Sequence, residues 1–167
     1  GIAKFKYQMV QLTANANEQM TLHSYTPVSN IDVISKAAVS GGYFNAFPDA
    51  DGSYRRSLLV VRNGDEYYPS LAAALLMQYL DAPDSVVKIG DTGVERITIG
   101  ETDIPVDEAG RLLVNYFGPA KTFPHYAAAD VLNHRVAPEA LRNKIVIVGV
   151  TAMGIFDMRV TPFSPVF

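Results

Sequence analysis

The chain has 167 residues, of which 49% are hydrophobic, so it is long enough to bury a core and short enough to form one compact domain. Its formal net charge is −3, and its 14 basic and 17 acidic residues are spread along the whole length. Arg55-Arg56 is the only adjacent basic pair, which excludes the clustered basic surface that binds nucleic-acid phosphates. Because there is no cysteine, thiol nucleophiles, iron–sulfur clusters and Cys-ligated zinc are excluded as well.

The sequence contains no segment that is expected to span a membrane. The longest apolar run in a predicted helix, Leu71 to Met77, is far below the roughly 20 residues that a bilayer requires. Residues 1–10 lack the layout of a signal peptide. We therefore expect any membrane anchor to lie outside these 167 residues.

The N-terminal part predicts one strand, a loop and one short helix. Residues 3–9 alternate between apolar and polar side chains, which is typical of a strand with one buried face. Residues 13–30 are polar and lack periodicity, which predicts a loop. Asn30 is then expected to cap a helix whose apolar residues fall between positions 31 and 37.

A β-hairpin over residues 54–68 is the clearest local prediction. Asn63-Gly64 separates two β-rich runs, and this pair supplies the positive φ angles of a tight hairpin turn. Pro69 is predicted to be the first residue of a helix that continues to Leu80. The face of this helix that packs on the core is expected to carry Leu71, Leu75, Leu76 and Tyr79.

The C-terminal half predicts several short strands and one buried strand. Residues 86–89, 94–99, 104–106 and 112–117 are expected to form a meander, followed by a helix over 126–134 and a turn at 138–141. Residues 144–150 are almost entirely apolar, which is typical of a central strand covered on both faces. The predicted fold class is therefore α/β, with a mixed sheet, a central buried strand at 144–150 and flanking helices.

The motifs of common enzyme chemistries are absent. Gly149 and Gly154 have P-loop spacing, but Ile155 and Phe156 stand where the phosphate-binding Lys and the Ser or Thr are required. No dinucleotide fingerprint and no nucleophile elbow are present. We expect no catalytic residue, no metal site and no cofactor.

The most suggestive carboxylates are Asp49 and Asp51, in an Asp-x-Asp-Gly pattern that could bind a hard cation. The continuation does not fit a calcium loop, because Tyr54 and Arg55-Arg56 follow instead of further oxygen ligands. An Asx-type turn with an Asp-to-Arg pair is favoured over a metal site.

Several segments in a fixed order resemble the second type of CHASE domain, the cyclase and histidine-kinase associated sensory extracellular modules. The resemblance is strongest over residues 41–162, and residues 1–40 carry no recognisable part of it. The segments that carry it are Gly42-Tyr43-Phe44-Asn45, residues 48–56, residues 68–72, residues 104–107, residues 110–119, residues 129–132, residues 143–152, Asp157 and Thr161-Pro162.

The resemblance implies an extracytoplasmic sensor, with residues 1–167 as the C-terminal part of a family domain about twice as long. It implies a bacterial inner-membrane parent, whose transmembrane helices lie outside this chain and whose output is an adenylate or guanylate cyclase or a histidine kinase. A homodimeric receptor and an unidentified small molecule or other stimulus are the expected partners. The family offers no established ligand contacts, so the candidate ligand-binding positions are only those that match its pattern, namely Asp49, Asp51, Arg55, Asn115 and Asp157.

Two other functions remain open from the sequence. One is a small soluble α/β hydrolase that uses Asp49, Asp51 and a histidine. The other is a dimerisation module that binds no ligand.

Overall fold

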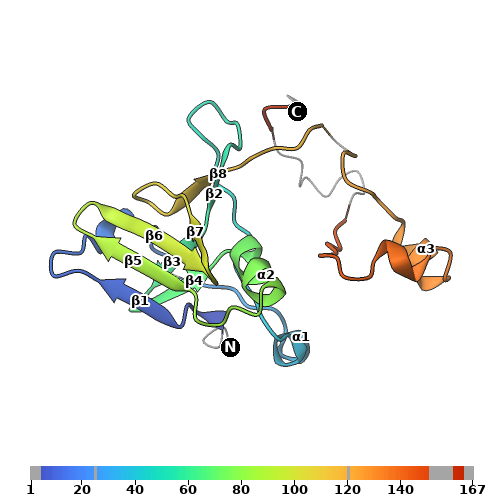
Figure 1. Ribbon diagram of the computed structural model, residues 1–167, viewed down its shortest axis with the longest axis horizontal. Helices are drawn as coiled ribbons and strands as arrows, with labels where there is room; N and C mark the ends of the chain where they lie inside the picture. Colours follow the sequence, from blue (N-terminus) through green and yellow to red (C-terminus); the bar gives the residue numbers. More distant parts are fainter. Residues whose placement is uncertain (1–4, 25, 120, 151–159, 164–167) are drawn as a thin grey trace.

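A four-stranded mixed sheet forms the centre of the molecule. The computed structural model describes residues 5–24, 26–119, 121–150 and 160–163. The sheet has the order β1-β5-β6-β7, and its strands span Met9–Leu12 (β1), Val86–Gly90 (β5), Gly93–Ile99 (β6) and Thr102–Ile104 (β7). β1 is parallel to β5, whereas β5, β6 and β7 are antiparallel neighbours (Figure 1). The predicted α/β class with a mixed sheet is confirmed.

The predicted meander is confirmed for three of its four strands. The fourth, β8 (Arg111–Leu113), pairs with β2 (Arg56–Leu58) in a separate two-stranded sheet. Asp107 redirects the chain, because its Oδ1 accepts hydrogen bonds from the N–H groups of Ala109 (3.1 Å) and Arg111 (2.9 Å). Gly110 completes this turn with φ +79°.

The predicted hairpin is present but shorter than expected. Its strands are β3 (Val60–Asn63) and β4 (Glu66–Pro69). Gly64 and Asp65 form the turn, and Gly64 has φ +60°, whereas Asn63 is the last residue of β3 and does not have the positive φ that was expected of it. Residues 56–58 belong instead to β2, because the chain changes partner at Leu59. The N–H of Leu59 donates to Gly110 (2.9 Å), and its carbonyl accepts from Ser70 (3.1 Å). This change of pairing partner at Leu59 depends on residues that are distant in the sequence, so it could not be predicted from the turn residues alone.

Helix α2 (Leu71–Tyr79) follows the hairpin directly. Ser70 is the N-cap of this helix, since its side chain accepts a hydrogen bond from the N–H of Ala73. Pro69, the predicted first residue of the helix, belongs to β4 instead. The predicted apolar face is only partly correct: Leu76 packs against the core, but the buried residues of the helix are Ala73 and Ala74, and Tyr79 is 61% exposed. Small side chains let the helix backbone approach the sheet closely, so the larger ones are displaced outward.

The core is built from β-branched side chains of the central sheet and the hairpin. Its fully buried members include Ile89, Ile97, Ile99, Val60 and Val87. Tyr7 joins them with 4% exposure, and its hydroxyl donates to the Leu59 carbonyl at 3.1 Å. The N-terminal strand was predicted over residues 3–9, whereas β1 begins only at Met9, and residues 1–4 lie outside the described part.

The remaining helices are short. They are η2 (Glu18–Met20), α1 (Asp32–Ala37), α3 (Ala128–Leu132) and η3 (Pro138–Ala140). The predicted Asn30 cap is not formed, because α1 begins after Ile31 and has no side-chain cap. α3 is shorter than the predicted 126–134. No helix in the described ranges is long and apolar enough to cross a bilayer.

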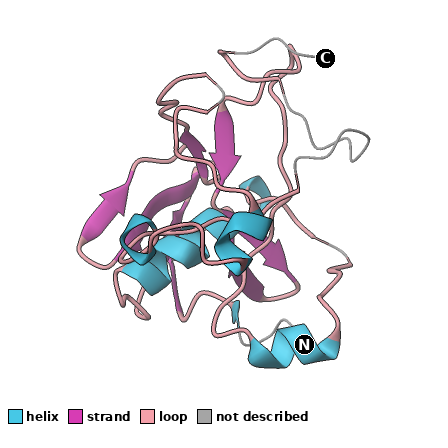
Figure 2. Cartoon of the chain, turned by 90° about the vertical axis from the view of Figure 1, so that its right-hand side faces the viewer, coloured by secondary structure: helices cyan, strands magenta, loops and turns pink. Residues whose placement is uncertain are grey.

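The predicted central strand at 144–150 is wrong. Residues 144–150 adopt no strand and are all exposed, with Ile147 at 80% and Val148 at 89%. They lie in a loop segment between α3 and α2 in the view of Figure 1, apart from the sheet, and Figure 2 shows this side of the molecule as loop on either side of short helices. An apolar run creates a need for burial, but it does not specify which sheet provides it. The described strands pair with one another and leave this run uncovered.

Candidate functional site

The loop before β2 and the first residue of β2, Arg56, hold a compact network of charged side chains. We call residues 48–56 the acidic turn. Asp51 Oδ1 accepts a hydrogen bond from the N–H of Ser53 at 3.0 Å, which closes an Asx turn. Gly52, between these two residues, has φ +83°. Arg55 binds both oxygens of Asp51 at 2.8 Å. Asp49 accepts from Arg55 at 3.4 Å and from Arg56 at 2.5 Å. The Asx turn and the Asp-to-Arg pairing predicted from the sequence are thus present.

The turn is neutral overall, because two carboxylates face two guanidinium groups. The hydrogen bonds from Arg55 and from the Ser53 N–H hold the pKa of Asp51 far below its ordinary value of 3.8. The same pairing with Asp51 and Asp49 raises the pKa of Arg55. Such a bidentate arrangement gives the turn a defined shape and leaves both carboxylates occupied by protein groups.

This arrangement predicts how Asp51 titrates. Asp51 should remain ionised at pH values well below 3.8, and Arg55→Met should return its pKa toward that value. Since the folded-state pKa is depressed, the pairing stabilises the fold above the unfolded-state pKa and is lost as pH falls through the folded-state pKa. An NMR titration of the Asp51 carboxyl carbon, in the wild type and in Arg55→Met, measures both pKa values. A wild-type pKa at or above 3.8 would contradict the pairing.

The acidic turn lies where the C-terminal residues return to residues 5–116, which contain all the described strands and which we call the sheet domain. The N–H of Tyr54 donates to the Val160 carbonyl at 2.9 Å, and the Tyr116 hydroxyl donates to the Tyr54 carbonyl at 2.5 Å. The rings of Tyr116 and Phe163 lie 6.4 Å apart. We call these four residues the junction. It brings the chain after β8 and the chain near the C-terminus onto one side of the acidic turn.

The sequence candidates are only partly brought together. Asp49, Asp51 and Arg55 form one network, as described. Asn115 follows Val114, whose N–H donates to the Arg55 carbonyl at 2.9 Å, so its backbone lies beside the turn while its side chain is exposed. Asp157 lies outside the described residues.

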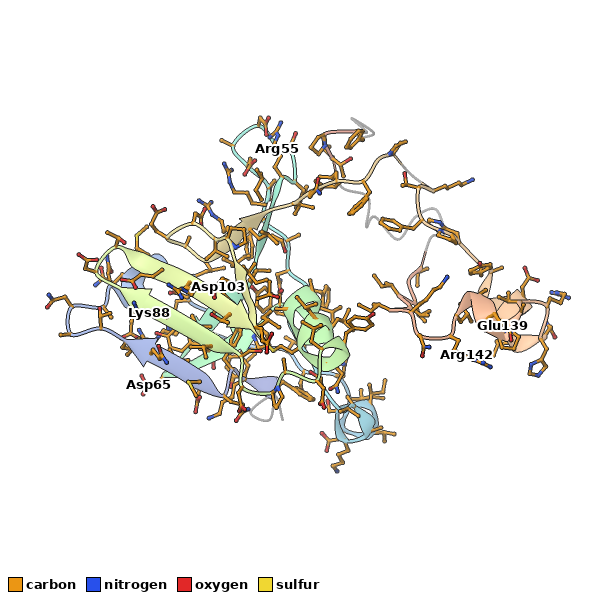
Figure 3. The ribbon with its side chains drawn as sticks, in the orientation of Figure 1. Arg55, Asp65, Lys88, Asp103, Glu139 and Arg142 are labelled. Atoms are coloured by element: carbon orange, nitrogen blue, oxygen red, sulfur yellow. The ribbon has the colours of Figure 1, made fainter. Side chains whose placement is uncertain are left out.

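A second charged cluster surrounds an open cleft of about 380 Å³, which we call the Glu18 cleft. Arg62 Nη1 lies 3.1 Å from Glu18 Oε2, its Nη2 lies 3.3 Å from Asp65, and its Nε donates to the Gly64 carbonyl at 2.7 Å. The Tyr67 hydroxyl donates to the same Glu18 carboxylate. Figure 3 shows Asp65 and Arg55 on opposite sides of the sheet domain, so the two clusters are separate.

Sequence reasoning missed the Glu18 cleft. Glu18 fell in a segment interpreted as loop, and it is 49 residues from Tyr67 in the chain. Tyr67 packs in the core and also lines the cleft, since it is 3% exposed and its side chain borders the cleft beside Glu18 and Arg62. Burial, the hydrogen bond to Glu18 and the Glu18 charge together raise the pKa of Tyr67.

The Tyr67 hydroxyl is expected to contribute measurably to stability. Tyr67→Phe should lower the free energy of unfolding by about 1–2 kcal/mol, because a hydrogen bond to a carboxylate is lost while the ring stays packed. Tyr79→Phe is the matched control, since Tyr79 is 61% exposed, and it should change little. Urea denaturation measures both. Equal effects of the two substitutions would show that the Glu18 contact adds nothing.

The described residues contain no group of three or more His, Asp or Glu side chains that could hold a metal ion. His125 and His134 lie before and after α3, far along the chain from the acidic turn. His23 forms a β-bridge with Arg62. The arrangement therefore offers shape, charge pairing and a cleft.

Comparison with known proteins gives one match. The family model described as CHASE2 domain matches residues 5–167. No curated protein and no solved structure matches. The match reaches well before residue 41, where the recognisable resemblance began, so the expectation that residues 1–40 stand outside it is corrected. The structure gives the reason: Tyr7 and β1 belong to the same core as the later strands.

Proposed function

Because this chain belongs to the CHASE2 family, a family of extracytoplasmic sensory domains, we propose that it is the stimulus-sensing part of a bacterial receptor anchored in the inner membrane. The single observation that supports this proposal is the family match over residues 5–167. The family is sensory and not catalytic, so the chain itself carries no enzyme activity. The parent's output domain is an adenylate or guanylate cyclase or a histidine kinase.

The junction is the proposed route of the signal from the sheet domain. One backbone hydrogen bond joins Tyr54 to Val160, and one ring contact joins Tyr116 to Phe163. The Tyr116 hydroxyl also donates to the Tyr54 carbonyl, and the acidic turn lies beside these contacts. A conformational change in the sheet domain would therefore reach the C-terminal residues through the contacts of the junction. The transmembrane helices of the parent lie outside this chain, and their motion relays the change to the output domain.

The stimulus is proposed to be a small molecule. The Glu18 cleft has a volume of about 380 Å³, and it combines charged groups with the apolar side chains of Val10 and Leu12. The acidic turn fits a ligand less well, because its Asp and Arg side chains already bind one another. Of the five candidate positions, Asp49, Asp51 and Arg55 are therefore proposed to shape the junction.

The hydrolase alternative finds no support in the site. It needs Asp49 or Asp51 as an available carboxylate beside a histidine, whereas Arg55 and Arg56 bind these carboxylates. We also propose that the full receptor is a homodimer. A ligand-free dimerisation module shares this homodimer and differs from a sensor only in lacking a stimulus.

A topology experiment tests the proposed location. Alkaline phosphatase fused after residue 163 of the full-length parent should be active, because this enzyme matures only outside the cytoplasm. A green fluorescent protein fused at the same site should be dark. The reverse pattern would refute an extracytoplasmic sensor.

A second experiment tests sensing. Periplasmic metabolites are screened for a rise in the melting temperature of the purified chain, and hits are tested for a change in output activity of the full-length parent. A hit that shifts both measurements supports a ligand sensor. If no compound shifts either one while the chain dimerises, the ligand-free module replaces this proposal.

A further inference from the structure

Glu18 is held in a defined position in the wall of the Glu18 cleft. It is the first residue of η2, which Asn17 caps through its side chain, and the chain that follows η2 pairs with β3. The N–H of Arg62 donates to the Leu22 carbonyl at 3.0 Å, and the N–H of Ser24 donates to the Arg62 carbonyl at 2.7 Å. These contacts join η2 to the sheet domain, so the Glu18 carboxylate is preorganised for binding.

One oxygen of the Glu18 carboxylate is occupied, and the other is available. Oε2 accepts a hydrogen bond from the Tyr67 hydroxyl and lies 3.1 Å from Arg62 Nη1. Oε1 accepts no hydrogen bond from the residues that the structure describes. An ionised carboxylate has about four acceptor sites, so Glu18 can still bind a donor. The acidic turn differs, because each carboxylate oxygen of Asp49 and Asp51 is bound by an arginine.

The Glu18 cleft has a net negative charge. Its charged lining residues are Glu18, Asp65 and Arg62, so two carboxylates face one guanidinium and the net charge is −1. The raised pKa of Tyr67 keeps its hydroxyl neutral. The sheet domain has eight basic and fourteen acidic residues, a net charge of −6, and its field favours the approach of a cation. The charge of the cleft and the charge of the domain therefore both disfavour an anionic ligand.

Arg62 is part of the wall of the cleft and does not take the place of a ligand. Its Nη1 and Nη2 lie 3.1 Å from Glu18 and 3.3 Å from Asp65, which Figure 3 labels. Its Nε donates to the Gly64 carbonyl at 2.7 Å, and its Cζ lies 5.9 Å from the centre of the Tyr67 ring. These contacts fix the guanidinium, so Arg62 acts as a positioning residue for the two carboxylates.

The opposite part of the lining is apolar. Val10 and Leu12 are two positions apart on β1, so their side chains lie on the same face of the strand. Both line the cleft, and Leu12 is 51% exposed. The volume of about 380 Å³ is typical of a small-molecule site and far exceeds what one metal ion fills. The lining therefore fits a molecule with a cationic end and an apolar body.

We propose that the Glu18 cleft binds a small organic cation, with a primary ammonium group on Glu18 Oε1 and an apolar body against Val10 and Leu12. An ammonium group has three donors and a compact charge, so Glu18 Oε1 accepts one of its hydrogen bonds and the Asp65 carboxylate adds attraction. This inference rests on the small-molecule stimulus proposed above and names its chemical class.

Three compounds with the same apolar part test the charge preference: 2-phenylethylamine, 2-phenylethanol and phenylacetate. Their dissociation constants are measured by NMR titration of the full-length parent in lipid nanodiscs, and empty nanodiscs correct for partition into lipid. The amine should bind at least about tenfold more tightly than the alcohol, because it donates to an ionised carboxylate, and phenylacetate should bind most weakly. An amine that binds no more tightly than the alcohol, or that fails to bind by about 10 mM, overturns the proposal.

Two variants assign the preference to the cleft. Glu18→Gln should remove most of the advantage of the amine over the alcohol. Asp65→Asn should reduce it by about threefold, and it carries the test if Glu18→Gln does not fold, since the Asp65 side chain is fully exposed. Glu95→Gln is the matched control: Glu95 pairs with Lys88 at 2.7 Å, its side chain is 34% exposed against 27% for Glu18, and it lies outside the cleft. Unchanged amine binding in Glu18→Gln and Asp65→Asn would overturn the proposal, because the cation would then bind elsewhere.

The failure of this inference can be told apart from the failure of the proposed function. If the amine shows no advantage while a periplasmic metabolite still shifts the melting temperature and the output activity, the chemical class is wrong and the sensor remains. If the alkaline phosphatase fusion is inactive and the green fluorescent protein fusion is bright, the extracytoplasmic sensor is refuted, whatever the amine does.

Discussion

Ile97→Ala is expected to lower the free energy of unfolding by about 2–5 kcal/mol. Ile97 is fully buried in the middle of β6, where it pairs with Val87 on one side and with Ile104 on the other. Removing its side chain leaves a cavity between three strands of the central sheet, and the close packing of a sheet core limits how far the neighbours can relax.

Urea denaturation measures this loss, with Val28→Ala as the control. Val28 is 94% exposed, so its truncation should stay within about 0.5 kcal/mol of the wild type. A similar small effect of Ile97→Ala would mean that the sheet is not the core of the domain. Because a loss of several kcal/mol is a large part of the stability of a small domain, we expect this variant to respond poorly in any receptor assay.

Gly93→Ala should also be strongly destabilising, by about 2–5 kcal/mol. Gly93 begins β6 with φ +122°, a conformation that residues with a side chain rarely adopt. A Cβ at this position would lie 2.3 Å from the Glu108 carbonyl oxygen and 2.9 Å from the Cβ of Met20. The carbonyl belongs to the backbone and accepts the N–H of Val94 at 2.8 Å, so it cannot move without breaking that bond.

Gly52→Ala separates the two causes of this effect. Gly52 has φ +83°, yet a Cβ there would meet nothing within 4 Å. Its replacement should cost only the backbone strain, about 1 kcal/mol. Thermal unfolding of both variants gives the comparison, and equal losses would show that the close contact at Gly93 does not matter.

Much of the fold was readable because it depends on local chemistry. Short β-rich runs separated by turn residues located β5 and β6, and Asn63-Gly64 located the turn between β3 and β4. Asp51, Ser53 and Arg55 lie within five residues of each other, so their turn and ion pair were also predictable. The network of Asp51 and Arg55 was thus predicted from the sequence, whereas its position beside the junction was not.

The opposite holds for contacts between distant residues. Glu18 and Tyr67 meet because η2 and β4 approach in space, and no local pattern links positions 49 apart. The exchange of partners at Leu59 depends on Gly110 and Ser70. The junction depends on the return of Val160 to Tyr54.

The sequence by itself determined the α/β class, the hairpin turn, the Asp-to-Arg pairing and the family resemblance. Each depends on residue type and short spacing, which act through local backbone preferences and hydrogen bonds. Only the tertiary structure decided that residues 144–150 are exposed, that Ala73 and Ala74 form the buried face of α2, and that β8 leaves the meander for β2. Apolar composition states how much surface must be buried, whereas the partner that buries it depends on the packing of the whole chain.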